Sequence, residues 1–386
     1  MEPKKRSVVF INQATGYLTI DIVNVFAVSC EVDRVALITG SIRVQDVALH
    51  EKVTWSKITL YSRGNPAKKF LSWLYGTIQI FFLLLTRYRK YEIFYITIPP
   101  FAYLLSLVLR NRFSILVFDV YPDALKIYNI SERNWIYKFW IKANKTLFKK
   151  AHRVFTIGEG MANLLTQYIS REKLTIIPNW SGLTRVKEVS REENHFIKNQ
   201  GVQGKFIIQY SGNIGYTHNV EVLVEMAKAL QSEEDIFVLI IGRGERYNQI
   251  QEIISKYRLK NCRLLPFQPD DQLNYTLSAA DLGVVLLDDK TAHVSIPSKI
   301  YNLQAVGVPI LGIAATNSEL AHHLEKCGNG ICFSPSSMES IVSFIKGYRT
   351  KISLQQEWRL NSKKASALYT IRNAEKYYTS YVQEIR

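Results

Sequence analysis

Cysteine is scarce in this chain of 386 residues, and no pair of cysteines has the C-x-x-C spacing of a metal or redox site. The four cysteines are scattered, which favours reduced thiols in a cytosolic setting: Cys30, Cys262, Cys327 and Cys332. The first residues, MEPKKRSVVFIN, pass straight into a strand-like run without a long apolar stretch, so no cleavable signal is evident. We therefore expect a cytoplasmic protein.

Acidic residues are few beside the basic ones, 33 Asp and Glu against 49 Lys and Arg, which gives a net charge of +16. Residues 1–183 carry 25 basic and 12 acidic residues, a net of +13, and this leaves +3 for residues 184–386. A basic half predicts an anionic partner, which is a nucleic acid, an acidic membrane surface or a phosphorylated acceptor. Because no recognised RNA-binding or DNA-binding module accompanies the charge, we predict no nucleic-acid partner.

Apolar residues make up 47% of the chain, enough to give two α/β domains a core each. The first domain, residues 1–183, opens as strand, loop and helix, the beginning of a doubly wound fold. From residue 205 onward, apolar runs alternate with helical stretches, which predicts a parallel sheet with helices on both faces in a second domain, residues 205–369. The polar stretch 184–204 is the expected linker.

Two stretches of the second domain have the composition of a phosphate-binding site. In YSGNIG at 210–215, an apolar strand runs into a Gly loop that can approach a phosphate closely. In IPSKIYNLQAVGVPI at 296–310, a Ser-Lys pair after Pro297 opens a helix. Backbone N–H groups, the helix dipole and the Lys299 ammonium are then expected to converge on one anion.

These stretches, with IIGRGER at 240–246, LPFQPDDQL at 265–273 and AADLGVVLL at 279–287, resemble the nucleotide-sugar domain of family-4 glycosyltransferases of the GT-B fold. The branch in question serves bacterial capsule, O-antigen and exopolysaccharide assembly and reads PSK-x-[FY]-x-x-MA-x-G-x-P in the last motif. This chain keeps seven of those positions: Pro297, Ser298, Lys299, Tyr301, Ala305, Gly307 and Pro309. The resemblance implies two Rossmann-like doubly wound domains facing a cleft, with a C-terminal helix at about 370–386 crossing back onto the first domain.

The resemblance also implies a binding site for a nucleoside-diphosphate sugar, expected to be UDP-linked. The phosphates would be held by Lys299 and the Gly212–Gly215 loop, and the turn at Phe267 would contact the base. A core aromatic is the alternative for Phe267. The full set of expected donor-binding residues is Ser211, Gly212, Asn213, Gly215, His218, Arg243, Gly244, Phe267, Ser298, Lys299 and Asn302.

The chain departs from the family at four of its usual charged positions. Asn213 and His218 stand where the family commonly has Arg and Lys, and Val294 and Asn302 stand where it has two Glu. The fixed positive charge is therefore reduced, and we expect Lys299 and Arg243 to supply it. Asn302 can still bond a ribose hydroxyl, because an amide both donates and accepts.

No Asp-x-Asp motif occurs in a cleft-forming loop. The adjacent pairs Asp270-Asp271 and Asp288-Asp289 are typical of turns and caps. Fixed cations and backbone dipoles can stabilise a leaving diphosphate in place of a divalent metal. We therefore predict a reaction that needs no metal and no cofactor.

The run FSILVFDVYPDAL at 113–125 predicts a strand that ends at Asp119. Ligands bind at the carboxyl ends of strands in open α/β sheets, so Asp119 is placed to meet a substrate; a helix-capping carboxylate is the alternative. The resemblance implies retention of anomeric configuration, with Asp119 positioning the acceptor or acting as an auxiliary base. Gly16 and Asp123 are further candidates for acceptor binding.

Residues 70–86, FLSWLYGTIQIFFLLLT, contain no charge and are bracketed by basic residues. At 17 residues the run is at the short limit for crossing a bilayer. A buried helix of the first domain is the favoured interpretation, while a helix lying partly in the membrane interface and a true span stay open.

Lysines recur at i, i+4, i+7 and i+11 in the first domain, which places them on one face of a helix: Lys138, Lys142, Lys145 and Lys149. Between Arg133 and Arg153 there is no acidic residue to pair with them. An ordinary solvated face is the alternative, but the pattern favours a face that contacts an anionic membrane.

The sequence therefore predicts a retaining, metal-independent hexosyltransferase of surface polysaccharide synthesis. It would move a sugar onto a polyprenyl-diphosphate-linked saccharide while peripherally associated with the inner face of the cell membrane. Two alternatives stay open. One is a nucleotide-sugar epimerase of the same fold, which needs no second substrate. The other, favoured by the four replaced positions, is a non-catalytic subunit that supports a partner transferase.

Overall fold

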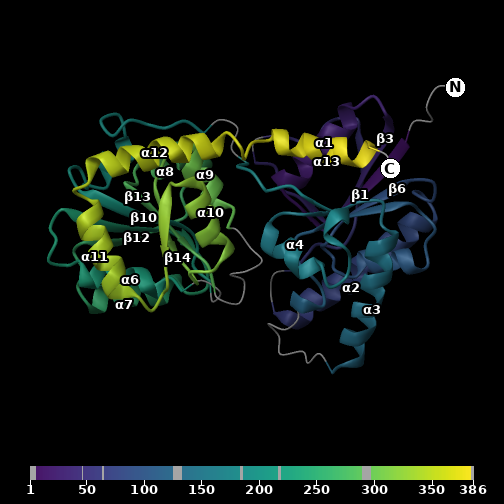
Figure 1. Ribbon diagram of the computed structural model, residues 1–386, viewed down its shortest axis with the longest axis horizontal. Helices are drawn as coiled ribbons and strands as arrows, with labels where there is room; N and C mark the ends of the chain where they lie inside the picture. The colour runs from purple at the N-terminus through teal and green to yellow at the C-terminus, as the bar shows by residue number, and fades with distance from the viewer. Residues whose placement is uncertain are drawn as a thin grey trace. The chain divides into compact units, whose positions relative to one another are not determined.

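The computed structural model describes residues 6–45, 47–62, 65–124, 133–182, 186–215, 219–288 and 297–383. The chain divides into two compact units, drawn in Figure 1. Unit 1 is Met1–Gly182 together with Ile371–Arg386, and unit 2 is Leu183–Thr370. Each unit is a parallel sheet flanked by helices.

Unit 1 is built on a seven-stranded sheet of order β5-β3-β1-β6-β7-β8-β9, in which every neighbouring pair is parallel. Its central strands are continuous apolar runs because helices cover both faces. The strands are β1 (Arg6–Ile11), β3 (Val32–Thr39), β5 (Val53–Lys57), β6 (Glu92–Ile96), β7 (Phe113–Val117), β8 (Val154–Thr156) and β9 (Leu174–Ile176). A separate short pair joins β2 (Ala14–Thr15) to β4 (Ser41–Ile42).

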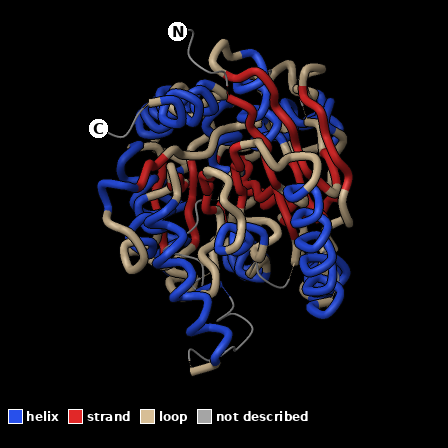
Figure 2. The backbone as a smooth tube through the Cα atoms, turned by 90° about the vertical axis from the view of Figure 1, so that its right-hand side faces the viewer, coloured by secondary structure: helices blue, strands red, loops and turns tan. Residues whose placement is uncertain are grey.

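The helices of unit 1 lie on both sides of this sheet, as Figures 1 and 2 show. On one side α1 (Tyr17–Val28) packs against the terminal helix α13 (Arg372–Val382), with the Phe26 ring 5.3 Å from Tyr378 and 5.1 Å from Tyr381. On the other side lie α2 (Pro66–Leu85) and α3 (Trp135–Lys150). Shorter helices complete the unit: η1 (Ala102–Leu107), α4 (Glu159–Leu165) and η3 (Arg171–Lys173).

Unit 2 has a six-stranded parallel sheet of order β12-β11-β10-β13-β14-β15. Its strands are β10 (Phe206–Asn213), β11 (Ile236–Arg243), β12 (Cys262–Pro266), β13 (Leu282–Leu286), β14 (Ile310–Ile313) and β15 (Gly330–Phe333). Its helices are α5 (His195–Asn199), α6 (Glu221–Ala229), α7 (Tyr247–Lys256), η4 (Asp270–Gln272), α8 (Leu273–Ser278), α9 (Lys299–Ala305), α10 (Glu319–Cys327), α11 (Met338–Tyr348) and α12 (Ile352–Ser366). Strands and helices alternate along the chain as the sequence predicts.

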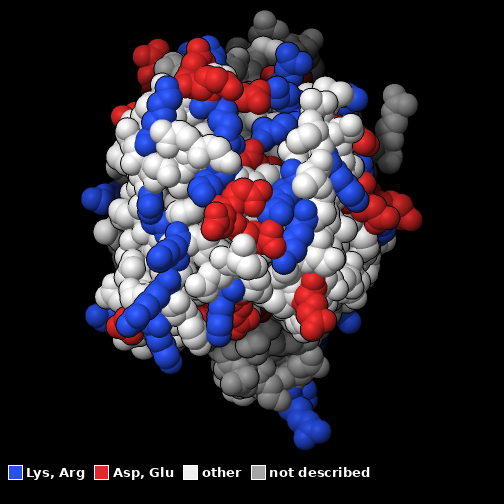
Figure 3. All heavy atoms as spheres, turned by 90° about the vertical axis from the view of Figure 1, so that its left-hand side faces the viewer, with Lys and Arg blue, Asp and Glu red and all other residues white. Residues whose placement is uncertain are grey.

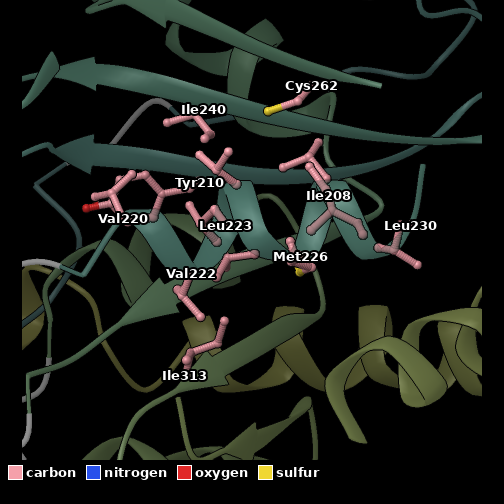
Figure 4. Close-up of a cluster of buried hydrophobic side chains, with 14 of the residues drawn as sticks. Ile208, Tyr210, Val220, Val222, Leu223, Met226, Leu230, Ile240, Cys262 and Ile313 are labelled. Carbon is pink, nitrogen blue, oxygen red and sulfur yellow. The ribbon is translucent and has the colours of Figure 1, made fainter. Parts of the chain in front are cut away.

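The core of unit 2 forms where α6 packs on the sheet. Figure 4 shows Leu223 and Met226 of α6 against Ile208 and Tyr210 of β10, and all four side chains are buried. Tyr210 lies two residues before Gly212, the first residue of the Gly loop. The loop is therefore anchored to a rigid part of the unit.

The stretch 184–204, predicted to be a linker between the domains, is part of a folded unit over its described residues. Its described residues, 186–204, belong to unit 2 and contain α5. Phe196 and Ile197 of α5 are buried against Leu239 of β11 and its neighbours. An apolar pair inside a polar stretch holds this segment on the sheet, because burial of two large side chains stabilises the packed position.

The favoured interpretation of residues 70–86 is only half right. They form most of α2, which buries one face and leaves the other exposed to solvent, including Phe70, Leu74 and Phe82. None of the helices in the described part of the chain combines the length and apolar content that crossing a membrane requires.

Candidate functional site

The Gly loop, the Gly-Arg-Gly turn and the Phe267 turn meet at one edge of the sheet of unit 2. Gly212 at the end of β10 is in register with Gly242 of β11, and Gly242 is in register with Pro266 at the end of β12. Because the strands are parallel, all three loops leave from the carboxyl edge, where open α/β sheets bind ligands.

Close approach of backbone requires a glycine at Gly242, and a side chain at Gly212 would displace the end of Lys299. A Cβ on Gly242 would lie 1.9 Å from the Gly212 carbonyl oxygen, and one on Gly212 would lie 2.2 Å from Lys299 Nζ. Real Cβ contacts are never this short, so neither position accepts a side chain without rearrangement. The absence of side chains lets the Lys299 ammonium lie directly against the Gly loop.

Lys299 opens α9 and reaches back across the sheet to Tyr210. Its Nζ donates a hydrogen bond to the Tyr210 hydroxyl at 3.0 Å and lies 4.1 Å from the centre of the Tyr210 ring. The Tyr210 hydroxyl donates in turn to the Asn213 carbonyl oxygen at 2.7 Å. One buried tyrosine thus links the two motifs that the sequence predicts to converge.

Burial sets the charge state of this pair. It lowers the pKa of the Lys299 ammonium to about 8, because desolvation disfavours the charged form. It also raises the pKa of Tyr210 above its ordinary value, so the hydroxyl keeps its proton near neutral pH. The site therefore presents a cation below pH 8 that is held in place by a neutral donor and acceptor.

Arg243 and Phe267 form an exposed pair at the same edge. The Arg243 guanidinium lies 4.9 Å from the centre of the Phe267 ring, and Phe267 is 55% exposed. Phe267 is therefore not a core aromatic, the alternative left by the sequence. An exposed ring beside a guanidinium provides a flat surface and a positive charge for a ligand.

The other predicted donor residues that the structure describes belong to the elements that meet at this edge. Ser211 is partly buried in β10, and Gly244 follows β11 with a φ of +156°. Ser298 is exposed directly before α9, and Asn302 is partly buried within it. His218 lies outside the described residues.

Tyr210 and Glu245 are site residues that sequence reasoning missed. A Cβ on Gly215 would meet the Asn213 side-chain amide at 2.7 Å and the Glu245 carboxylate at 2.9 Å, so both groups converge on the Gly loop. The hydrophobic pattern assigns Tyr210 to the core, where its ring does lie. Glu245 follows Gly244 in the GRGER motif, and this position was its only sequence signal.

In unit 1, Asp119 lies just beyond β7 at the carboxyl edge of the sheet. The Thr97 hydroxyl, which follows β6, accepts hydrogen bonds from the backbone N–H of Phe118 at 3.0 Å and of Asp119 at 3.3 Å. Part of the Asp119 surface is exposed to solvent. Desolvation by the neighbouring protein raises the pKa of its carboxyl, and the Lys69 ammonium opposes that shift.

The two other acceptor candidates have different surroundings. Gly16 precedes α1, and a Cβ there would meet no atom within 4 Å. The Asp123 carboxylate accepts hydrogen bonds from the hydroxyls of Tyr137 at 2.9 Å and Tyr168 at 2.7 Å. These bonds tie its loop to α3 and explain the residue structurally, so acceptor binding by Asp123 stays a prediction.

The four predicted lysines of α3 are all exposed, as their spacing requires: Lys138, Lys142, Lys145 and Lys149. The buried face of the helix includes Tyr137, Trp140 and Leu147. Within the described ranges, no three His, Cys, Asp or Glu side chains lie close enough together to hold a metal ion.

Comparison with known proteins finds sequence similarity mainly in unit 2. Residues 191–365 match the family described as glycosyl transferases group 1. The chain is 31% identical over 197 residues to WcaI of Escherichia coli K12, a candidate colanic acid biosynthesis glycosyl transferase, over 50% of this chain and 48% of WcaI. It is 25% identical over 244 residues to WbjE of Pseudomonas aeruginosa, a candidate glycosyltransferase, over 63% of this chain and 61% of WbjE. These matches span about half to three fifths of each relative.

The structural likeness extends over the whole chain. The crystal structure of Anabaena HepE in complex with UDP and glucose has a TM-score of 0.69 and 14% identity, covering 98% of this chain and 100% of HepE. At this identity the likeness shows the fold alone. That fold is GT-B, with two Rossmann-like units, and the prediction of the fold class is confirmed.

Proposed function

We propose that this protein transfers a sugar from a nucleoside-diphosphate donor, of the UDP class, to a saccharide carried on polyprenyl diphosphate. The observation that carries the proposal is the Lys299 ammonium held against the Gly212 loop at the carboxyl edge of the unit 2 sheet. The group 1 match over unit 2 supports a transferase. The name of WcaI, which refers to colanic acid biosynthesis, supports a role in surface polysaccharide synthesis.

Donor binding would use the residues of unit 2 in distinct roles. Lys299 and the N–H groups of the Gly loop would neutralise the diphosphate, whose negative charge grows as the sugar leaves. Arg243 would add positive charge at the diphosphate, the neighbouring Phe267 ring would contact the base, and Asn302 would bond a ribose hydroxyl. The UDP bound by HepE supports a uridine donor. We propose that these fixed charges and dipoles suffice without a divalent metal.

The transfer step would retain the anomeric configuration. The bond between the anomeric carbon and the diphosphate oxygen breaks, and the acceptor oxygen bonds to the same face of the sugar. The acceptor proton passes to the departing phosphate oxygen. Asp119 of unit 1 would orient the acceptor hydroxyl for this transfer or, as the alternative, take up the proton itself as an auxiliary base.

A supporting subunit is the second candidate, because Asn213 stands where the family commonly has a cation. The position of Lys299 favours catalysis instead, since a cation in contact with the Gly loop restores charge at the phosphate position. A sugar epimerase is less favoured, because it gives no role to a basic first domain.

The test is a screen of the purified protein against UDP-, GDP- and dTDP-sugars with and without EDTA. We expect selective binding of UDP-sugars and a slow release of UDP that EDTA does not change. Binding of none of the sugars would overturn the proposal in favour of a supporting subunit. Release that EDTA abolishes would overturn the metal-independent mechanism, and accumulation of an epimerised UDP-sugar would establish the epimerase.

A further inference from the structure

Helix α2 has its large apolar side chains on the outside. The exposed residues, each between 41% and 60% accessible, are Phe70, Leu71, Leu74, Tyr75, Ile78, Phe82 and Leu85. At about 100° per residue these positions fall within an arc of roughly 140°. The buried face instead contains three small or hydroxyl-bearing residues, Ser72, Gly76 and Thr77, beside its larger apolar ones. Surface helices of globular proteins normally show the reverse arrangement.

Hydrogen bonds fix α2 in this orientation. Gln13, which follows β1, donates from its side-chain amide to the carbonyl oxygens of Ser72 at 2.8 Å and Thr59 at 2.9 Å. Gly76 makes room for that amide, because a Cβ there would lie 2.7 Å from Gln13 Nε2. A rotation that buried the apolar row would break these buried bonds and leave their polar groups unpaired. The exposed apolar face is therefore a fixed feature of unit 1.

Helix α3 belongs to the same rigid part of the unit. Phe101 lies between the two helices, with its ring 6.2 Å from Trp73 of α2 and 5.3 Å from Trp140 of α3. Further apolar side chains are exposed nearby: Leu107 and Val108 at the end of η1, and Trp135, Ile136 and Phe139 on α3. We call the exposed residues of α2 and α3 together the α2–α3 surface.

The charges of the α2–α3 surface identify its partner. Lys138, Lys142, Lys145 and Lys149 are exposed on α3, and no acidic residue occurs from 134 to 152. Basic residues also flank both ends of the exposed row on α2: Lys68 before it, and Arg87, Arg89 and Lys90 after it. An apolar face bordered by cations complements a bilayer with anionic headgroups, and the combination of the two signals gives stable attachment where one alone does not.

We propose that α2 lies in the interface of an anionic phospholipid bilayer, with its exposed apolar face among the acyl chains and the lysines of α3 on the headgroups. The proposal adds a membrane-binding surface to the proposed function. It rests on that function in one respect, that the membrane supplies the lipid-linked acceptor. The first turns of α2 lie near Asp119, since the ring of Trp73 in α2 is 5.9 Å from the ring of Tyr121, two residues after Asp119. The membrane helix and the candidate acceptor site therefore lie together.

The first experiment measures binding of the full chain to phosphatidylcholine vesicles with and without phosphatidylglycerol. Leu74→Glu with Ile78→Glu places two charges in the apolar row and should weaken binding to the anionic vesicles by about tenfold or more. The matched control is Ile352→Glu with Leu360→Glu on α12 of unit 2, whose side chains are 58% and 53% exposed. This control should bind like the wild type.

The second experiment replaces the four lysines of α3 with Gln. Each lysine close to an anionic surface contributes roughly fivefold, so we expect at least about a tenfold loss on anionic vesicles and a weaker dependence on salt. Four exposed lysines of unit 2 provide the matched control: Lys187, Lys198, Lys256 and Lys260. Binding to pure phosphatidylcholine should not change in either variant.

Three results would overturn the proposal. One is wild-type vesicle binding by the Leu74→Glu, Ile78→Glu variant. Another is an equal loss in the α12 control. The third is a wild-type dimer that this variant converts to a monomer without vesicle binding, which would assign the surface to a second copy of the chain. UDP-sugar binding by the variant, measured without vesicles, checks that the protein is folded and separates this test from that of the proposed function.

Discussion

The charged side chains of the two units differ in how they are paired. In unit 2, acidic side chains are paired, with Glu233 bound to Lys346 at 2.8 Å and to Arg349 at 2.7 Å. Figure 3, which looks onto the side where Figure 1 draws unit 2, shows basic and acidic side chains interspersed. In unit 1, by contrast, the lysines of α3 form no ion pair with any described residue.

This difference indicates that the two units suit two kinds of ligand. A balanced surface with a partly buried cation at the carboxyl edge of the sheet suits a small anion, which needs charge at a single point. Unpaired cations spread along a helix suit an extended anionic surface, where attraction adds over many weak contacts. The comparison therefore predicts that donor binding depends on unit 2 alone and that turnover depends on both units.

The largest effect is expected at Lys299. Lys299→Ala removes the cation that would stabilise the departing diphosphate, so kcat/KM for the donor should fall by roughly a hundredfold to a thousandfold. Affinity for free UDP should fall with it. Calorimetry with UDP and UDP-sugars measures the binding, and Lys256→Ala, an exposed lysine of the same unit, is the control. Unaltered affinity for both ligands would remove Lys299 from the site.

A smaller and more selective effect is expected at Asp119. Asp119→Asn keeps the shape and removes the charge, so turnover should fall on the order of tenfold while the affinity for UDP-sugar stays unchanged. Steady-state kinetics with a lipid-linked acceptor separates the two quantities. Asp33→Asn, an exposed carboxylate in β3 of the same unit, should change neither. A loss of donor affinity in Asp119→Asn would contradict the division between the units.

Much of unit 2 could be predicted from its sequence because its motifs are local. A strand followed by glycines indicates a loop at the carboxyl edge, and parallel strands bring such loops together whatever their separation in the chain. Hence the convergence of Lys299 and Gly212 follows from the motifs. The Tyr210 hydroxyl bond could not be predicted, because a core tyrosine and a site tyrosine have the same hydrophobic pattern.

The orientation of α2 could not be predicted for a different reason. Its sequence is apolar on every side over most of its length, so the period of 3.6 residues does not tell which face is buried. The orientation is fixed by Gln13, far away in the sequence, whose amide bonds the Ser72 carbonyl and occupies the space that the missing side chain of Gly76 leaves. Long-range polar contacts of this kind leave no local signal.

The smallest expected effect concerns pH and tests how Tyr210 positions Lys299. Only the protonated amine of Lys299 attracts a diphosphate, so the donor affinity of the wild type should fall as the pH rises through about 8, the pKa of this partly buried lysine. Tyr210→Phe removes the hydroxyl that accepts from Nζ and stabilises the charged form. The pKa of Lys299 should then be lower still, and the fall in affinity should begin at a lower pH.

At a pH well below both transitions, the loss in Tyr210→Phe should be only several-fold, the size expected for one hydrogen bond. Titrations of UDP affinity against pH for the two proteins measure the shift. A tyrosine that served only to fill the core would lower the affinity equally at every pH and leave the midpoint unmoved. A shifted midpoint would instead show that the Tyr210 hydroxyl, which belongs to the core of unit 2, sets the pKa of Lys299. The exposed lysines of α3 in unit 1 have no such partner among the described residues and would interact with solvent and membrane.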